Sequence, residues 1–192
     1  MFLALGSQSP KTAQANSSFF LMAYFSPVEL SRLMLVRADV TSAISRIMTR
    51  FEQRTGYKTY VISGYRFLDQ QAATYADSIK GGYRAVPSDE SYHPLGAAVD
   101  LGIVGQVTSA ELDKKNPLYR TLASIGVEEG LDAGFNFKSG KPDPYHFQAR
   151  ETLTDAKTHW QALTRGRLWR LAIIAATLAL VTILVRSQSR SR

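Results

Sequence analysis

Two short segments place histidines beside carboxylates, and they constrain the fold more than any other feature of the sequence. The first runs from Ser91 to Asp100 and contains His93, and the second is Asp143-Pro144-Tyr145-His146. These two histidines are among only three in the chain. Two imidazoles and one carboxylate form a zinc ligand set that leaves the fourth position for water or substrate. A fold that binds zinc in this way has to bring the two segments together.

The residues around the candidate ligands predict two short strands. Gly96 allows a tight backbone turn between His93 and Asp100, and residues 97–103 are small or apolar apart from Asp100, as in a buried strand. A second strand is predicted at 145–147, after a turn with two prolines. Alternation along it places His146 on the face opposite its neighbours.

Asp143 precedes His146 by three residues, where its carboxylate could act on a water at the metal. This combination is typical of a hydrolytic site. A Ser-His-Asp triad from Ser91, His93 and Asp100 is the rival chemistry. It has no nucleophile elbow of the Gly-x-Ser-x-Gly type, and it leaves Asp143 and His146 without a role. The His-Glu-x-x-His helix motif of another zinc peptidase class is absent from the sequence.

The segments resemble motifs of the zinc D-Ala-D-Ala carboxypeptidase and L-alanyl-D-glutamate peptidase family, whose members cleave peptidoglycan stem peptides. The pattern Ser-x-His-x-x-Gly-x-Ala-x-Asp is matched by Ser91, His93, Gly96, Ala98 and Asp100, and the pattern carboxylate-x-x-His by Asp143 and His146. An upstream motif is similar to Ser63-Gly64-Tyr65-Arg66, followed by Gln70 and Gln71. The resemblance covers residues 28–150.

This resemblance implies a small antiparallel sheet with a zinc ion on one face and helices on the other. It implies three Zn²⁺ ligands, which are His93, Asp100 and His146. It implies catalytic roles for Asp143, as general base, and for Arg66, which would bind substrate and polarise its carbonyl. The residues expected to bind substrate are Ser91, Tyr145 and Gln70.

Two positions depart from the pattern that is common in this family. Many of its carboxypeptidases have Glu in place of Asp143 and Trp in place of Tyr145. An Asp at the base position is more similar to the phage endolysin branch, which cuts L-Ala–D-Glu bonds. Both D-Ala-D-Ala carboxypeptidase and L-Ala-D-Glu endopeptidase activity therefore stay open. A hedgehog-like zinc-containing binding module without turnover is a further alternative, although a carboxylate beside the open metal position favours an enzyme.

Hydrophobic periodicity predicts an α+β domain over residues 27–155. Apolar residues at spacings of three and four indicate a helix over 28–55, and a β-branched strand follows at 59–63. Further helices are predicted at 67–79, 117–129 and 151–163, with another strand at 134–138. The chain has no cysteine, which excludes disulfides.

The charges divide the chain in two. It has 23 basic and 16 acidic side chains, and seven of the basic but none of the acidic ones follow Asp155. The peptidase domain is therefore neutral, which argues against nucleic acid as its partner. Six of these seven basic residues flank an apolar segment at 168–185, which contains Arg170 and is about 27 Å long as a helix. We expect this segment to cross the membrane, whose hydrocarbon core is about 30 Å thick.

The resulting prediction is a zinc-dependent peptidase that hydrolyses peptidoglycan stem peptides in cell-wall lysis or remodelling. A flexible arm (1–26) precedes the domain, and a basic linker (156–167), the single-pass anchor and a basic tail (186–192) follow it. Basic residues on both sides of the anchor leave its orientation open. A signal-like segment within the arm and a membrane-active lysis protein that acts through its tail are alternatives.

Overall fold

The computed structural model describes residues 25–81, 85–106, 115–138 and 142–167 of the 192-residue chain. These residues fall into two units that divide between Glu151 and Thr152. The first contains a sheet with its helices, and the second is helical over residues 153–167. The predicted α+β class is confirmed.

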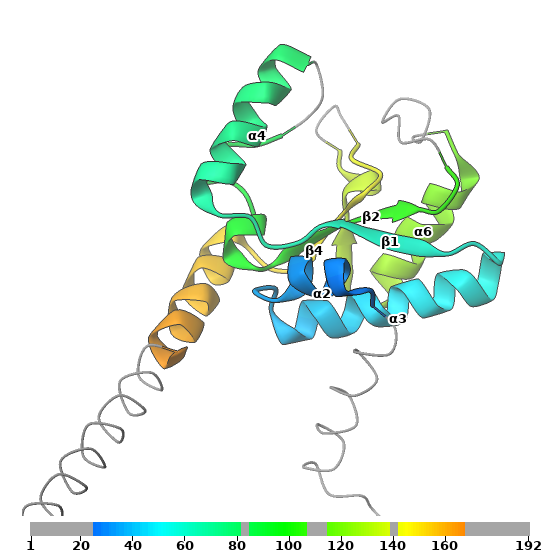
Figure 1. Cartoon of the computed structure of the whole chain (residues 1–192), viewed down its shortest axis with the longest axis horizontal. Coiled ribbons are helices and arrows are strands. Elements are labelled where there is room, and N and C mark those ends of the chain that lie inside the picture. The colour runs from blue at the N-terminus through cyan, green and yellow to red at the C-terminus, as the bar shows by residue number, and fades with distance from the viewer. Residues whose placement is uncertain (1–24, 82–84, 107–114, 139–141, 168–192) are drawn as a thin grey trace, which may run out of the picture. The chain divides into compact units, whose positions relative to one another are not determined.

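The sheet of the first unit is small and antiparallel throughout. Its order is β1-β2-β4-β3 (Figure 1), and its strands are β1 (Thr59–Ser63), β2 (Ala98–Ile103), β4 (His146–Ala149) and β3 (Leu131–Ala133). Strands β1, β2 and β4 lie where the sequence predicts them. The two segments that carry the candidate ligands are therefore neighbours in the sheet.

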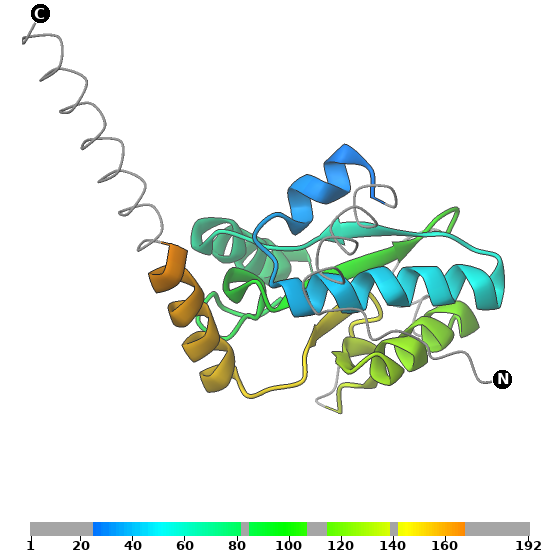
Figure 2. The same ribbon diagram turned by 90° about the horizontal axis from the view of Figure 1, so that it is seen from below.

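Two amphipathic helices cover one face of this sheet. They are α3 (Ala38–Thr55) and α6 (Pro117–Glu128), which lie side by side in Figure 2. Fully buried side chains fill the space between helices and sheet: Val40, Ile44, Ile47 and Phe51 from α3, Leu122 and Ile125 from α6, and Val61, Val99, Leu101, Ile103 and Phe147 from the strands. Burying these side chains fixes which face of each strand looks away from the core.

The helix predicted over 28–55 is wrong in one respect, because it is broken into α2 (Pro27–Leu33) and α3. Arg37 is extended at the break, and its backbone N–H donates to Gly96 O at 2.9 Å. The turn lets α2 lie against β1, whose Val61 N–H donates to Glu29 Oε1 at 3.0 Å and whose Val61 carbonyl accepts from Arg32. Side chains of α2 thus satisfy the outer edge of the sheet.

The strand predicted at 134–138 is also wrong. Strand β3 ends at Ala133, and Gly134–Asn136 form a 3₁₀ turn, η2. The Gly134 carbonyl accepts from Phe137 N–H at 3.1 Å and from Asp143 N–H at 2.9 Å, so the chain turns back on itself. These bonds replace a strand ladder and bring residues 142–145 close to the sheet.

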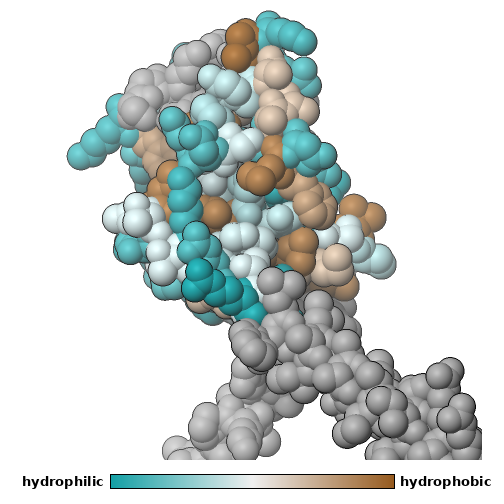
Figure 3. All heavy atoms as spheres, turned by 90° about the vertical axis from the view of Figure 1, so that its left-hand side faces the viewer, coloured by the Kyte–Doolittle hydropathy of each residue, from teal (hydrophilic) through white to brown (hydrophobic). Residues whose placement is uncertain are grey.

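Helix α4 (Leu68–Gly81) contacts the 3₁₀ turn η1 (His93–Leu95). Figure 3 shows one side of the molecule, where apolar side chains lie in several small groups with hydrophilic side chains between them. The predicted anchor (168–185), basic tail and most of the N-terminal arm lie outside the described residues. Within the described residues, no helix is long and apolar enough to cross a membrane.

Candidate metal centre

The centre is built on a row of polar side chains across three adjacent strands. Asp100 of β2 lies directly opposite His146 of β4, and on its other side it is paired with Ser63 of β1. Directly opposite residues in antiparallel strands have Cβ atoms about 5 Å apart. The sheet register alone therefore brings these three side chains together.

A β-bulge places Ser63 in this row. The pairs Val61↔Leu101 and Ser63↔Asp100 differ by one residue in register, which makes Ile62 the extra residue of β1. In regular pairing Ser63 would share the core face with Val61, because residues two apart point the same way. The bulge turns Ser63 to the opposite face, toward Asp100.

His93 comes from outside the sheet, from the turn η1. Its Nδ1 lies 2.7 Å from the carbonyl oxygen of Gly64, and the residue is buried. Gly96 ends the turn with φ +62°, a conformation that favours glycine, as the sequence predicts. Gly64 also has to be glycine, because an added Cβ would lie 2.2 Å from the Arg32 carbonyl oxygen.

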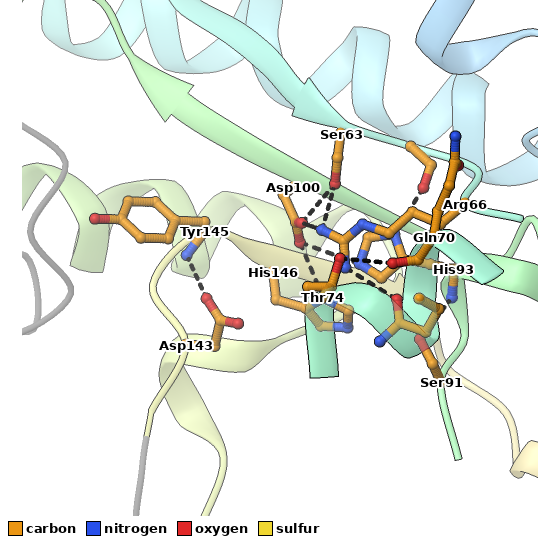
Figure 4. Close-up of polar contacts among 12 residues, drawn as sticks. Ser63, Arg66, Gln70, Thr74, Ser91, His93, Asp100, Asp143, Tyr145 and His146 are labelled. Atoms are coloured by element: carbon orange, nitrogen blue, oxygen red, sulfur yellow. Dashed lines mark hydrogen bonds and ion pairs between the residues drawn. The ribbon is translucent and has the colours of Figure 1, made fainter. Parts of the chain in front are cut away.

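The three predicted ligands meet in one cluster (Figure 4). One ligand atom from each of His93, Asp100 and His146 lies within 4.8 Å of the others. Asp100 Oδ1 is 3.3 Å from His93 Nε2 and 3.1 Å from His146 Nδ1. A single carboxylate oxygen thus faces one nitrogen of each imidazole.

The second nitrogen of each imidazole has a partner that fixes its tautomer. His93 Nδ1–H donates to the Gly64 carbonyl, and His146 Nε2–H donates to Gln148 Oε1 at 2.9 Å. The lone pairs of His93 Nε2 and His146 Nδ1 then point at the cluster. Histidines that bind metals show this arrangement. Two nitrogens and one carboxylate oxygen fit zinc, which takes three protein ligands in catalytic sites.

The electrostatics of the cluster favour a charged carboxylate between imidazoles. Burial alone raises the pKa of Asp100, but His93 and His146 outweigh it and hold this pKa well below its ordinary value. Burial lowers the pKa of His93. Burial also opposes protonation of His146, but the adjacent Asp100 carboxylate favours the protonated imidazole, and the pKa of His146 is raised above its ordinary value in the metal-free cluster. An ionised Asp100 is the form that binds a cation.

Asp143 approaches the cluster from the loop before β4. Burial, and then the negative charge of Asp100, raise the pKa of its carboxyl above the ordinary value. Its Oδ1 accepts the Tyr145 N–H at 3.2 Å. An added Cβ at Gly134 would lie 2.6 Å from the Asp143 carbonyl oxygen. The glycine therefore allows this loop to pack close to η2.

The cluster opens into a cavity of about 460 Å³, which Asp143 also lines. Ser91 lines it too, is buried, and accepts the His93 N–H through its Oγ at 3.3 Å. Tyr145 lines the cavity, but its ring points away from the ligands in Figure 4 and packs edge-on against Tyr119. Contact of Ser91 and Tyr145 with substrate stays a prediction.

The structure places the two glutamines of α4 differently. Gln70 lines a separate cavity of about 360 Å³, and its Oε1 accepts the Phe67 N–H at 3.0 Å. Gln71 lines the cavity of the ligands, is 1% exposed, and accepts from Arg66 Nη1 at 3.1 Å. Gln71 thus lies in the cavity of the ligands, and Gln70 lies in the neighbouring one, so that its contact with substrate stays a prediction.

Arg66 lines both cavities, and its guanidinium contacts the cluster directly. Its Nη2 donates to Ser63 Oγ at 2.6 Å and to Asp100 Oδ2. The structure places Arg66 beside the candidate ligands and pairs it with one of them, Asp100. The contact of Arg66 with substrate stays a prediction.

No protein-family model matches the chain, and no curated protein matches it. Solved structures do match. The L-Ala D-Glu endopeptidase ChiX of Serratia marcescens is 22% identical, with a TM-score of 0.46 over 68% of this chain and 91% of that one. The LD-carboxypeptidase LdcB is 16% identical, with a TM-score of 0.49 over 66% of this chain and 64% of that one.

A third match is the vancomycin resistance D,D-pentapeptidase VanY in complex with Zn(II). It is 17% identical, with a TM-score of 0.45 over 66% of this chain and 78% of that one. The structures that this chain resembles are thus peptidases with peptidoglycan-type substrates, and one of them holds zinc. At these identities and TM-scores the similarity decides nothing about the chemistry of this chain, which has to be argued from the cluster itself.

Proposed function

We propose that the chain is a zinc-dependent peptidase that hydrolyses peptidoglycan stem peptides. The observation that carries the proposal is the convergence of His93, Asp100 and His146, with fixed tautomers, in a cavity that also contains Asp143. Zinc bound there would polarise a carbonyl oxygen and lower the pKa of a water to about 7. A structural zinc site would need a fourth protein ligand.

Asp143 is the proposed general base. Its raised pKa makes it a better proton acceptor than an ordinary aspartate. Its carboxylate would take a proton from the attacking water and pass it to the leaving amine. The Tyr145 N–H holds one carboxylate oxygen and so orients the group. A binding module without turnover would have no use for a second carboxylate in this cavity.

The test is digestion of purified peptidoglycan, followed by mass spectrometry of the fragments. Wild-type protein should release D-alanine if it is a carboxypeptidase, or stem peptides that begin with D-Glu if it cuts the L-Ala–D-Glu bond. Asp143→Asn keeps the shape and loses the base, so we expect bound zinc to be retained and turnover to fall by about 10²- to 10⁴-fold.

Asp132→Asn is the matched control. Asp132 lies on β3 and pairs with Arg150 at 3.1 Å, outside the lining of the cavity. It should cleave at the wild-type rate. If Asp143→Asn also cleaves at that rate, Asp143 is a turn residue. If wild-type protein binds zinc and releases no fragment, the binding-module alternative replaces the enzyme.

We also propose that residues 168–185 hold the enzyme at a membrane, where its domain acts in cell-wall lysis or remodelling. Support comes from the sequence, in which a largely apolar segment contains Arg170 as its one charged residue and has only basic charges on its flanks. The second candidate, a membrane-active protein that works through its tail, rests on the same segment. This second candidate does not explain why His93, Asp100 and His146 converge.

A further inference from the structure

Arg66 is held by the protein on several sides. One guanidinium nitrogen, Nη2, donates to Ser63 Oγ and Asp100 Oδ2, and the other, Nη1, donates to Gln71 Oε1. Gln71 is itself fixed, because its Nε2 donates to the Val86 carbonyl at 2.9 Å. These bonds give the guanidinium a fixed orientation at the cluster.

The two oxygens of Asp100 have different surroundings. Oδ1 faces the two imidazoles at 3.1 and 3.3 Å. Oδ2 accepts from Ser63 Oγ at 2.6 Å and from Arg66. Figure 4 shows Ser63 and Arg66 converging on this carboxylate. Bonds between a carboxylate and a charged donor are among the strongest hydrogen bonds in proteins, so this orientation is well defined.

We propose that Ser63 and Arg66 are positioning residues that hold Asp100 Oδ2 away from the metal, so that Asp100 binds through Oδ1 alone. The proposal rests on the zinc site of the proposed function. A catalytic zinc needs three ligand atoms from the protein and one open position. A carboxylate free to bind with both oxygens would occupy that position.

The β-bulge in β1 gives this role a structural basis. Without Ile62 as the extra residue, Ser63 would face the core and could not reach Asp100. The bulge also leads the chain to Gly64, whose carbonyl fixes the His93 tautomer, and to Arg66. The bulge therefore positions the residues that hydrogen-bond to two of the ligands, His93 and Asp100. Hydrogen bonds of this kind to metal ligands control metal affinity.

The experiment measures zinc affinity by competition with a chromophoric chelator, for Ser63→Ala, Arg66→Lys and the double variant. Ser63→Ala changes no charge, and Arg66→Lys keeps the charge but loses the planar fork. We expect each to weaken zinc binding by about 10- to 100-fold, the usual effect of losing an outer-shell partner. Because both act on Asp100 Oδ2, the double variant should lose less than the product of the single effects.

Cobalt-substituted protein gives a second readout that needs no substrate. If Oδ2 enters the coordination shell in the variants, the visible absorption of Co²⁺ should weaken, as it does when the coordination number rises above four. Arg32→Ala is the matched control, because Arg32 also binds β1, at the Val61 carbonyl, and does not touch the cluster. Its zinc affinity and cobalt spectrum should equal those of the wild type.

Three outcomes would overturn the proposal. One is wild-type zinc affinity and cobalt spectrum in Ser63→Ala and Arg66→Lys, with a raised KM in Arg66→Lys, which would make Arg66 a substrate ligand alone. Another is an equal loss of zinc in Arg32→Ala, which would show a general effect on β1. A third is strict additivity in the double variant. Failure of the proposed function can be distinguished from these outcomes, because the wild-type protein itself would then bind no zinc or would cleave no peptidoglycan.

Discussion

At the scale of single residues, Gly134 decides where the candidate base lies. Its missing side chain leaves room for the Asp143 carbonyl oxygen and for the Cβ of His146, which would lie 2.6 and 2.9 Å from an added Cβ. Contacts this short force a shift of backbone, because neither partner is the end of a flexible side chain. Gly134 thus couples the position of the base to that of a ligand.

We therefore predict that Gly134→Ala displaces Asp143 and lowers the rate of peptidoglycan cleavage by at least about 10-fold, since an error of 1 Å in position can cost about 10²-fold. The check is the initial rate of cleavage beside the thermal unfolding curve. Gly166→Ala, which would meet no atom within 4 Å, should match the wild type in both. A wild-type rate in Gly134→Ala would show that the loop adapts without cost.

The ligands could be predicted from the sequence because each lies in a short motif, His93 and Asp100 in one and His146 with Asp143 in the other. Gln148 was open to the same reasoning, since it follows His146 by two residues and shares its face of β4. Ser63 was not, because its place opposite Asp100 depends on a bulge that only the pairing of β1 with β2 creates. The choice between Gln70 and Gln71 depends on the rotation of α4, which its weak amphipathic pattern does not settle.

At the scale of elements, the apolar periodicity of residues 28–55 predicted which side chains are buried, but it did not predict that the helix breaks. Val36 is buried and keeps the apolar spacing of a single helix across the break between α2 and α3. The partners that stabilise the break, Gly96 O for the Arg37 N–H and Tyr65 N–H for the Arg32 carbonyl, come from distant parts of the chain. A local pattern carries no information about such partners.

The packing of α6 on β4 leads to a prediction at this scale. An added Cβ at Gly126 would lie 2.4 Å from the ring of Phe147, which is fully buried. Overpacking of this kind costs about 1–3 kcal/mol, and the better helix propensity of Ala returns at most about 1 kcal/mol. We expect Gly126→Ala to lower the free energy of unfolding by up to about 2 kcal/mol in urea denaturation.

The zinc affinity of Gly126→Ala should fall together with its free energy of unfolding, because Phe147 lies between His146 and Gln148 on the same strand. The exposed position Ser124 on α6 provides the control, and Ser124→Ala should leave both quantities near the wild-type values. Unchanged stability in Gly126→Ala would mean that α6 can move away from the sheet freely.

At the scale of the whole molecule, the charge distribution predicts a catalytic domain that does not need its C-terminal segment. We expect full-length protein to stay in membranes through high salt and alkaline washes, because salt screens surface charges beyond about 10 Å at 0.1 M but leaves an inserted helix in place. A chain that ends at Gly166 should be released and still cleave peptidoglycan. Loss of zinc or unfolding of the shortened chain would identify the segment as part of the core.

The central claim is that His93, Asp100 and His146 together hold one zinc ion. Metal analysis of the purified protein and of His93→Ala, Asp100→Ala and His146→Ala tests it most directly. The account predicts one zinc per chain in the wild type and loss of most of it in each variant, because no remaining pair supplies the three ligands of a catalytic site. Full zinc occupancy in His146→Ala would contradict it.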